Sequence, residues 1–133
     1  MRFLALLVIL ALTAAGAAWA EDFALIEPQA LAARLETAGS PLLMLDVRTA
    51  AEFDAGHIPG AVNIPHDVLG ERIAELGPAD ERDVVVYCRS GRRSAIALAR
   101  LREAGFSRLF HLEGDYLRWS EEGRPLIRAL GQP

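Results

Sequence analysis

The chain of 133 residues contains no lysine and only one cysteine, Cys88. A single cysteine cannot form an intramolecular disulfide, so the fold has to be stabilised by its hydrophobic core. His66 and His111 lack metal-ligand spacing with any second cysteine or histidine, and we predict no metal site. Because lysine is absent, every basic residue is arginine, which we attribute to compositional bias.

Size and charge limit the classes of function that the chain can have. Its length fits one domain of ordinary size, and it carries no internal repeats or low-complexity tracts. Acidic residues number 18 against 14 basic ones, for a net charge of −4. This acidic balance argues against nucleic acid as a partner.

The N-terminal residues have the pattern of a secretory signal peptide. Arg2 precedes an uncharged run from Phe3 to Ala20, which ends in Ala18-Trp19-Ala20 before an acidic pair. We predict cleavage after Ala20, giving a signal peptide over residues 1–20, a domain over residues 21–133, and a periplasmic or secreted protein without stable membrane association. The alternative is an uncleaved membrane anchor, because the run is near the lower limit for spanning a bilayer.

The remaining sequence predicts an α/β fold, with a mostly parallel sheet and helices on both faces. Apolar runs predict strands at 23–26, 42–47, 61–64, 83–87 and 109–112, and helices are predicted at 28–38, 49–54, 67–76, 94–104 and 115–122. Ligands of such sheets bind at the carboxyl ends of the strands. Cys88 directly follows one of these ends.

Cys88 opens a segment typical of a nucleophile, which we call the cysteine loop (residues 88–94). The N-terminus of the following helix, together with Arg89, Arg92 and Arg93, favours the thiolate and also binds anions. An inert core position is unsuitable for such a charged segment, so we expect an exposed loop. Export would place this free thiol in an oxidising compartment, which indicates a chemical role unless it pairs with another molecule or is accidental.

Within the cysteine loop we predict that the backbone N–H groups of residues 89–94 bind the anion, since the loop itself holds them in place. The three arginine side chains are expected to share this work unequally. Gly91 is predicted to supply a conformation or a close approach that a β-carbon would obstruct. Ser94 is predicted to cap the helix.

Other conspicuous residues are predicted to be structural. Asp46, Arg48 and Glu52 are expected to include an ion pair after the second strand, and Thr49 with Glu52 matches a capping box. We expect His57 to make a structural hydrogen bond, and Trp119 to be a core anchor.

Several motifs together resemble the single-domain rhodaneses, which are sulfurtransferases. They are Leu45-Asp46-Val47-Arg48, Glu52-Phe53, the run from Gly56 to Pro65, the run from Tyr87 to Ser94, and Leu112-Glu113-Gly114. The resemblance implies a five-stranded sheet and a Cys88 persulfide that carries sulfur from a small anionic donor such as thiosulfate to cyanide, a thiol or a protein acceptor. It also implies substrate contacts from Arg89, Ser90, Gly91, Arg92, Arg93, Ser94 and Arg48, and no metal or organic cofactor.

Two alternative functions stay open. A cysteine-dependent phosphatase or arsenate reductase would have arginine six positions after the cysteine, where this chain has Ser94. A non-catalytic persulfide carrier would need the same cysteine and loop as an enzyme.

The sequence departs from the family pattern at Asp115, where many members have the second of two glycines. We expect Asp115 to cap the last helix, and its charge would weaken binding of a dianion.

Overall fold

The computed structural model describes residues 23–129, so the predicted signal peptide and its cleavage site lie outside the described residues. The described strands are β1 (Ala24–Ile26), β2 (Leu42–Asp46), β3 (Val62–Asn63), β4 (Asp83–Tyr87) and β5 (Leu109–Leu112). The helices are α1 (Pro28–Glu36), α2 (Ala50–Ala55), α3 (Leu69–Arg72), η1 (Ile73–Leu76), α4 (Arg92–Glu103) and α5 (Asp115–Glu121), of which η1 is a 3-10 helix.

The five strands form one sheet in the order β1-β5-β4-β2-β3, and every pairing between them is parallel. This confirms the predicted fold class. The central strands β2 and β4 are continuous apolar runs buried on both faces, as expected for a parallel sheet with helices on each side.

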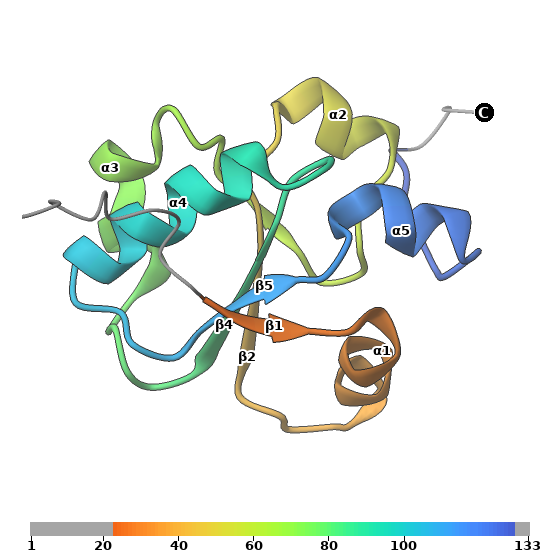
Figure 1. Ribbon diagram of the computed structural model, residues 1–133, viewed down its shortest axis with the longest axis horizontal. Coiled ribbons are helices and arrows are strands. Elements are labelled where there is room, and N and C mark those ends of the chain that lie inside the picture. The colour runs from red at the N-terminus through yellow and green to blue at the C-terminus, as the bar shows by residue number, and fades with distance from the viewer. Residues whose placement is uncertain (1–22, 130–133) are drawn as a thin grey trace, which may run out of the picture.

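Two apolar layers cover the sheet. On one face, α3, η1 and α4 contribute Leu69, Leu76 and Leu98 to the core. On the other face, Leu31 of α1 and Trp119 of α5 are buried, which confirms Trp119 as a core anchor. Figure 1 shows α1 and α4 on opposite sides of the strands.

The predicted helix at 67–76 is instead divided into α3 and η1. Val68 precedes α3 without a side-chain capping bond, and Gly70 lies within its four residues, which disfavours a regular helix.

Within residues 23–129, no helix is both long and apolar enough to span a membrane.

Because the strands are parallel, their carboxyl ends lie along one edge of the sheet. Arg48 follows β2, Cys88 follows β4, and Asp115 follows β5. β4 lies between β2 and β5, so these three positions converge around the cysteine.

Candidate functional site

Cys88 lies at the carboxyl end of β4, and only 1% of the residue is exposed. The expectation of an exposed loop position is therefore wrong for the cysteine itself. Its side chain packs in the same cluster as Val47 and Val86, while the next two residues of the loop are exposed. The Gly91 N–H donates a hydrogen bond to Sγ at 3.0 Å, which places a fixed donor on the sulfur.

Gly91 has a φ of +126°, in the region that favours glycine, and it is the N-cap of α4. A β-carbon at this position would lie 3.3 Å from Asp115 Oδ2 and 3.6 Å from His111 Cε1. The prediction that this position needs glycine is confirmed. The first-turn N–H groups of α4 lack intrahelical acceptors, so α4 presents donors and the positive end of its dipole to the loop.

Ser94 does not cap α4, contrary to prediction, because the helix begins two residues earlier, at Arg92. The Ser94 side chain is buried within the first turn, and its hydroxyl donates to Asp115 Oδ1 at 2.8 Å. Of the N–H groups at residues 89–94 that were predicted to bind an anion, that of Gly91 donates to Sγ.

The three arginines of the cysteine loop have different surroundings. Arg93 forms a bidentate ion pair with Glu52, with N–O distances of 2.6 and 3.0 Å. The side chains of Arg89 and Arg92 are exposed, and within residues 23–129 no hydrogen bond or ion pair engages them. Ser90 is exposed as well. Two guanidinium groups therefore remain available to an incoming anion.

Arg48 is 3% exposed and paired with Asp46, which confirms the predicted ion pair after β2. Its Nε and Nη2 donate to the carboxylate, and Nη2 also donates to the Gly56 carbonyl at 2.7 Å. Its guanidinium carbon lies 5.6 Å from the ring centre of Tyr87 and 4.2 Å from that of Tyr116. Asp46 and the Gly56 carbonyl thus engage Nε and Nη2 of Arg48 within the protein.

Glu52 joins two parts of the site. It completes a capping box with Thr49 at the start of α2, as predicted, and it also binds Arg93 on α4. The Arg93 guanidinium lowers the pKa of Glu52 to about 2. His57 Nδ1 lies 2.9 Å from the Phe53 carbonyl oxygen, and this confirms its structural hydrogen bond.

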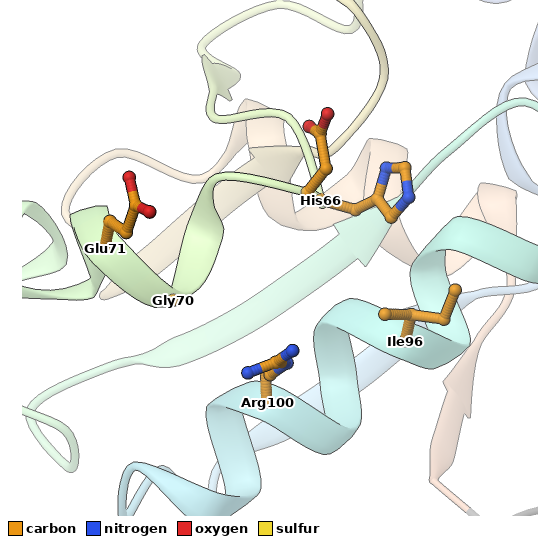
Figure 2. Close-up of a pocket in the computed structure, with 6 residues that line it drawn as sticks. His66, Gly70, Glu71, Ile96 and Arg100 are labelled. Atoms are coloured by element: carbon orange, nitrogen blue, oxygen red, sulfur yellow. The ribbon is translucent and has the colours of Figure 1, made fainter.

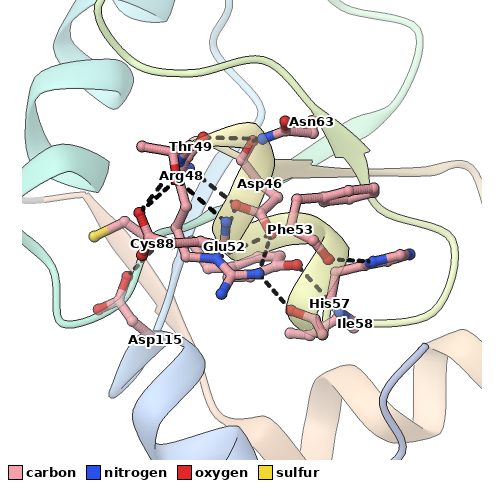
Figure 3. A network of polar contacts seen from close by, with 12 residues as sticks. Asp46, Arg48, Thr49, Glu52, Phe53, His57, Ile58, Asn63, Cys88 and Asp115 are labelled. Carbon is pink, nitrogen blue, oxygen red and sulfur yellow. Dashed lines mark hydrogen bonds and ion pairs between the residues drawn. The ribbon is translucent and has the colours of Figure 1, made fainter. Parts of the chain in front are cut away.

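Asp115 is the residue whose place the sequence did not predict. It is 2% exposed, and Gly114, not Asp115, is the N-cap of α5. Its Oδ1 accepts the backbone N–H of Cys88 at 2.9 Å, as Figure 3 shows. His111 Nε2 lies 3.0 Å from both carboxylate oxygens. The predicted cap is wrong because the side chain turns inward to the cysteine loop.

Burial opposes the ionisation of Asp115, but hydrogen bonds from His111, Cys88 and Ser94 outweigh it. The pKa of this carboxyl consequently lies below its ordinary value. An ionised carboxylate only accepts hydrogen bonds, so His111 Nε2 carries the proton that it donates. Asp115 could be singled out in the sequence because it departs from the family pattern. The direction of its side chain could not be predicted, because it depends on how the chain passes from β5 into α5.

A separate hollow of about 400 Å³ lies between residues 66–71, which include the start of α3, and the outer face of α4 (Figure 2). It contains none of the predicted site residues, and is lined by His66, Asp67, Gly70, Glu71, Ile96 and Arg100. Among residues 23–129, no group of three or more histidine, cysteine, aspartate or glutamate side chains is placed to hold a metal ion.

Comparisons with known proteins agree with this geometry. A sulfurtransferase from Allochromatium vinosum is 39% identical over 106 residues, which cover 80% of this chain and 96% of that protein. Thiosulfate sulfurtransferase 16 of Arabidopsis thaliana, a chloroplast protein, is 36% identical over 93 residues, covering 61% of this chain and 76% of that one.

The crystal structure of the Alr3790 protein from Anabaena sp. matches the fold with a TM-score of 0.73 at 30% identity, over 79% of this chain and 82% of that one. The family model for the rhodanese-like domain matches residues 27–122. With the cysteine loop at the carboxyl end of the central strand of a five-stranded parallel sheet, the chain belongs to the rhodanese-like domain family.

Proposed function

We propose that the protein transfers sulfane sulfur through a persulfide on Cys88. The observation that carries this proposal is the Gly91 N–H on Sγ, beside the N-terminus of α4. A fixed donor and a helix terminus stabilise negative charge on sulfur, both in the thiolate and in the persulfide. The sulfurtransferase relatives support the same chemistry.

With thiosulfate as donor, the Cys88 thiolate attacks the outer sulfur. The new Sγ–S bond forms as the S–S bond of thiosulfate breaks, and sulfite leaves with the bonding electron pair. Cyanide or a thiolate then attacks the outer sulfur of the persulfide, which regenerates the Cys88 thiolate. The exposed Arg89 and Arg92 side chains would attract the anionic donor.

Cys88 is 1% exposed, so a donor has to approach Sγ past the exposed residues of the cysteine loop. Only the terminal sulfur atom of a donor has to reach Sγ, which requires less space than a tetrahedral oxyanion does. Moreover, Ser94 stands where a phosphatase would place its arginine, and that serine is buried against Asp115, while Arg93 is engaged by Glu52. These contacts favour sulfur transfer over phosphatase or arsenate reductase chemistry.

Intact-mass measurement tests the proposal. Incubation of the protein with thiosulfate should add one sulfur atom, and cyanide should then remove it as thiocyanate. Cys88→Ser, as the matched control, should gain no sulfur. A persulfide that resists cyanide and passes only to a protein thiol would identify a carrier instead of an enzyme. Failure to gain sulfur from either thiosulfate or an organic persulfide would refute both functions.

We also propose that the chain is exported, on the basis of the signal-peptide pattern of residues 1–20. Cell fractionation followed by N-terminal sequencing tests this. A mature protein that begins at Glu21 in the periplasm or medium is expected, whereas a retained Met1 in a membrane fraction would indicate an anchor.

A further inference from the structure

Two of the arginines near Cys88 are neutralised by carboxylates, so the positive charge of the site is smaller than its number of arginines indicates. Arg93 is paired with Glu52, and Arg48 is paired with Asp46, so neither guanidinium contributes an uncompensated positive charge. The positive groups that remain are the N-terminus of α4 and two exposed arginine side chains. Against them stands one buried carboxylate, that of Asp115.

The Asp115 carboxylate lies against both ends of the turn that holds the sulfur. Oδ1 accepts the N–H of Cys88 at 2.9 Å, and Oδ2 is 3.3 Å from the position of a β-carbon on Gly91. Within residues 23–129, Asp115 is the one non-glycine residue with a positive φ, at 52°. Aspartate tolerates this conformation better than most residues, which allows a charged side chain at this position.

Hydrogen bonds keep this charge in place. Ser94 from α4, the Cys88 N–H after β4 and His111 from β5 all donate to the carboxylate. No arginine pairs with Asp115 among the described residues. The carboxylate therefore places a negative charge next to the backbone of Cys88, which His111 neutralises only when its imidazole is protonated.

We propose that Asp115 determines donor specificity by charge, so that the site discriminates against dianionic donors such as thiosulfate and favours persulfides of small thiols. This inference rests on the proposed sulfur transfer through Cys88. Thiosulfate brings two negative charges to a thiolate, whereas a persulfide brings one as R–S–S⁻ and none as the reactive form R–S–SH. The additional charge interacts unfavourably with Asp115, and one charge unit in a partly buried site corresponds to roughly a five- to tenfold change in affinity.

The step with a persulfide donor balances without an external oxidant or reductant. The Cys88 thiolate attacks the outer sulfur of R–S–SH, the Sγ–S bond forms as the S–S bond of the donor breaks, and R–S⁻ leaves with the electron pair. The proton of the donor remains on the new Cys88 persulfide or passes to water.

The test measures how fast Cys88 gains sulfur, by intact mass in single turnover, from thiosulfate and from 2-hydroxyethyl persulfide. Asp115→Asn keeps an oxygen for the Cys88 N–H and removes the charge. We expect the loading rate with thiosulfate to rise roughly five- to tenfold, with a larger rise at low salt, and the rate with the persulfide to change by less than about twofold. Asp115→Gly, which suits the positive φ, should shift the donor preference in the same direction.

The matched control is Glu113→Gln, which removes the same formal charge from a half-buried residue that faces Arg118. It should leave the ratio of the two loading rates unchanged. The inference is overturned if both donors speed up equally in Asp115→Asn and Asp115→Gly, if thiosulfate does not respond, or if the control responds equally. A wild-type protein that takes sulfur from neither donor would instead refute the proposed function itself.

Discussion

The ion pair between Arg93 and Glu52 predicts that the arginines of the cysteine loop have different roles. Arg93 is expected to stabilise the fold, whereas Arg89 and Arg92 are expected to attract the donor. Helix α2 buries none of its own side chains, and this pair joins Glu52 of α2 to Arg93 at the start of α4. If Arg93 serves this structural purpose, removal of the pair should weaken the fold more than it weakens donor binding.

The magnitude follows from geometry and exposure. The pair is bidentate, and its side chains are 24% and 30% exposed, between a surface pair and a buried one. Exposed pairs contribute about 0.2 to 1 kcal/mol, and bidentate geometry adds to this, so we expect a coupling free energy of about 1 to 1.5 kcal/mol. Glu52→Gln is a suitable partner for the cycle, because glutamine also completes a capping box with Thr49.

The assay is a double-mutant cycle of Glu52→Gln and Arg93→Gln by urea denaturation, with sulfur loading measured on each variant. We expect the double variant to load from thiosulfate within about twofold of the wild type, whereas Arg89→Gln with Arg92→Gln should slow loading roughly fivefold or more. The reasoning is refuted if the coupling free energy is near zero. It is also refuted if loss of Arg93 slows loading as much as loss of the two exposed arginines.

Three further predictions concern the cysteine loop and its support. Cys88→Ser should keep the fold, with a stability change of about 1 kcal/mol or less in urea denaturation, because serine also accepts the Gly91 N–H, while thiosulfate adds no mass. Gly91→Ala should lower stability by about 1 to 3 kcal/mol and slow alkylation of Cys88, because its φ is +126° and the new methyl group would contact Asp115; an unchanged melting temperature and alkylation rate would contradict this. The pKa of Glu52, lowered from 4.5 to about 2, means that its contribution to stability is complete above about pH 4.5 and is lost as the pH falls toward 2. Wild type should therefore lose about 1 kcal/mol more than Glu52→Gln in that window, and parallel stability curves for the two proteins would exclude it.

Most of the fold could be predicted because its central strands, β2 and β4, are buried on both faces. The continuous apolar runs at β2 and β4 are typical of strands in a parallel sheet covered on both faces, and β4 has the predicted bounds. The start of α4 was less predictable. Serine is a preferred N-cap, but the Ser94 hydroxyl is bonded to Asp115, and Gly91 provides the turn instead.

The position of Cys88 could also be predicted, because a cysteine after a buried strand and before a helix lies at the ligand-binding edge of a parallel sheet. The burial of the Cys88 side chain could not be predicted. The charged residues next to Cys88 indicate exposure, and Arg89 and Arg92 are exposed, yet the cysteine side chain points into the cluster of Val47 and Val86. Charged neighbours in the sequence thus predict that a loop is exposed, but they do not predict whether one side chain of the loop points into the core.

Asp115 shows why local reasoning about a helix start was insufficient at this site. An aspartate before a helix is ordinarily a cap, and that role needs an extended backbone whose side chain turns toward the helix. Here Gly114 has a φ of 79° and Asp115 a φ of 52°, so two successive left-handed residues turn the side chain away from α5. Meanwhile the N–H groups of Tyr116 and Leu117 bind the carbonyl oxygens of Cys88 and Arg89. The start of α5 is thus joined to the cysteine loop through its backbone, and this connection places the Asp115 carboxylate beside the backbone N–H of Cys88.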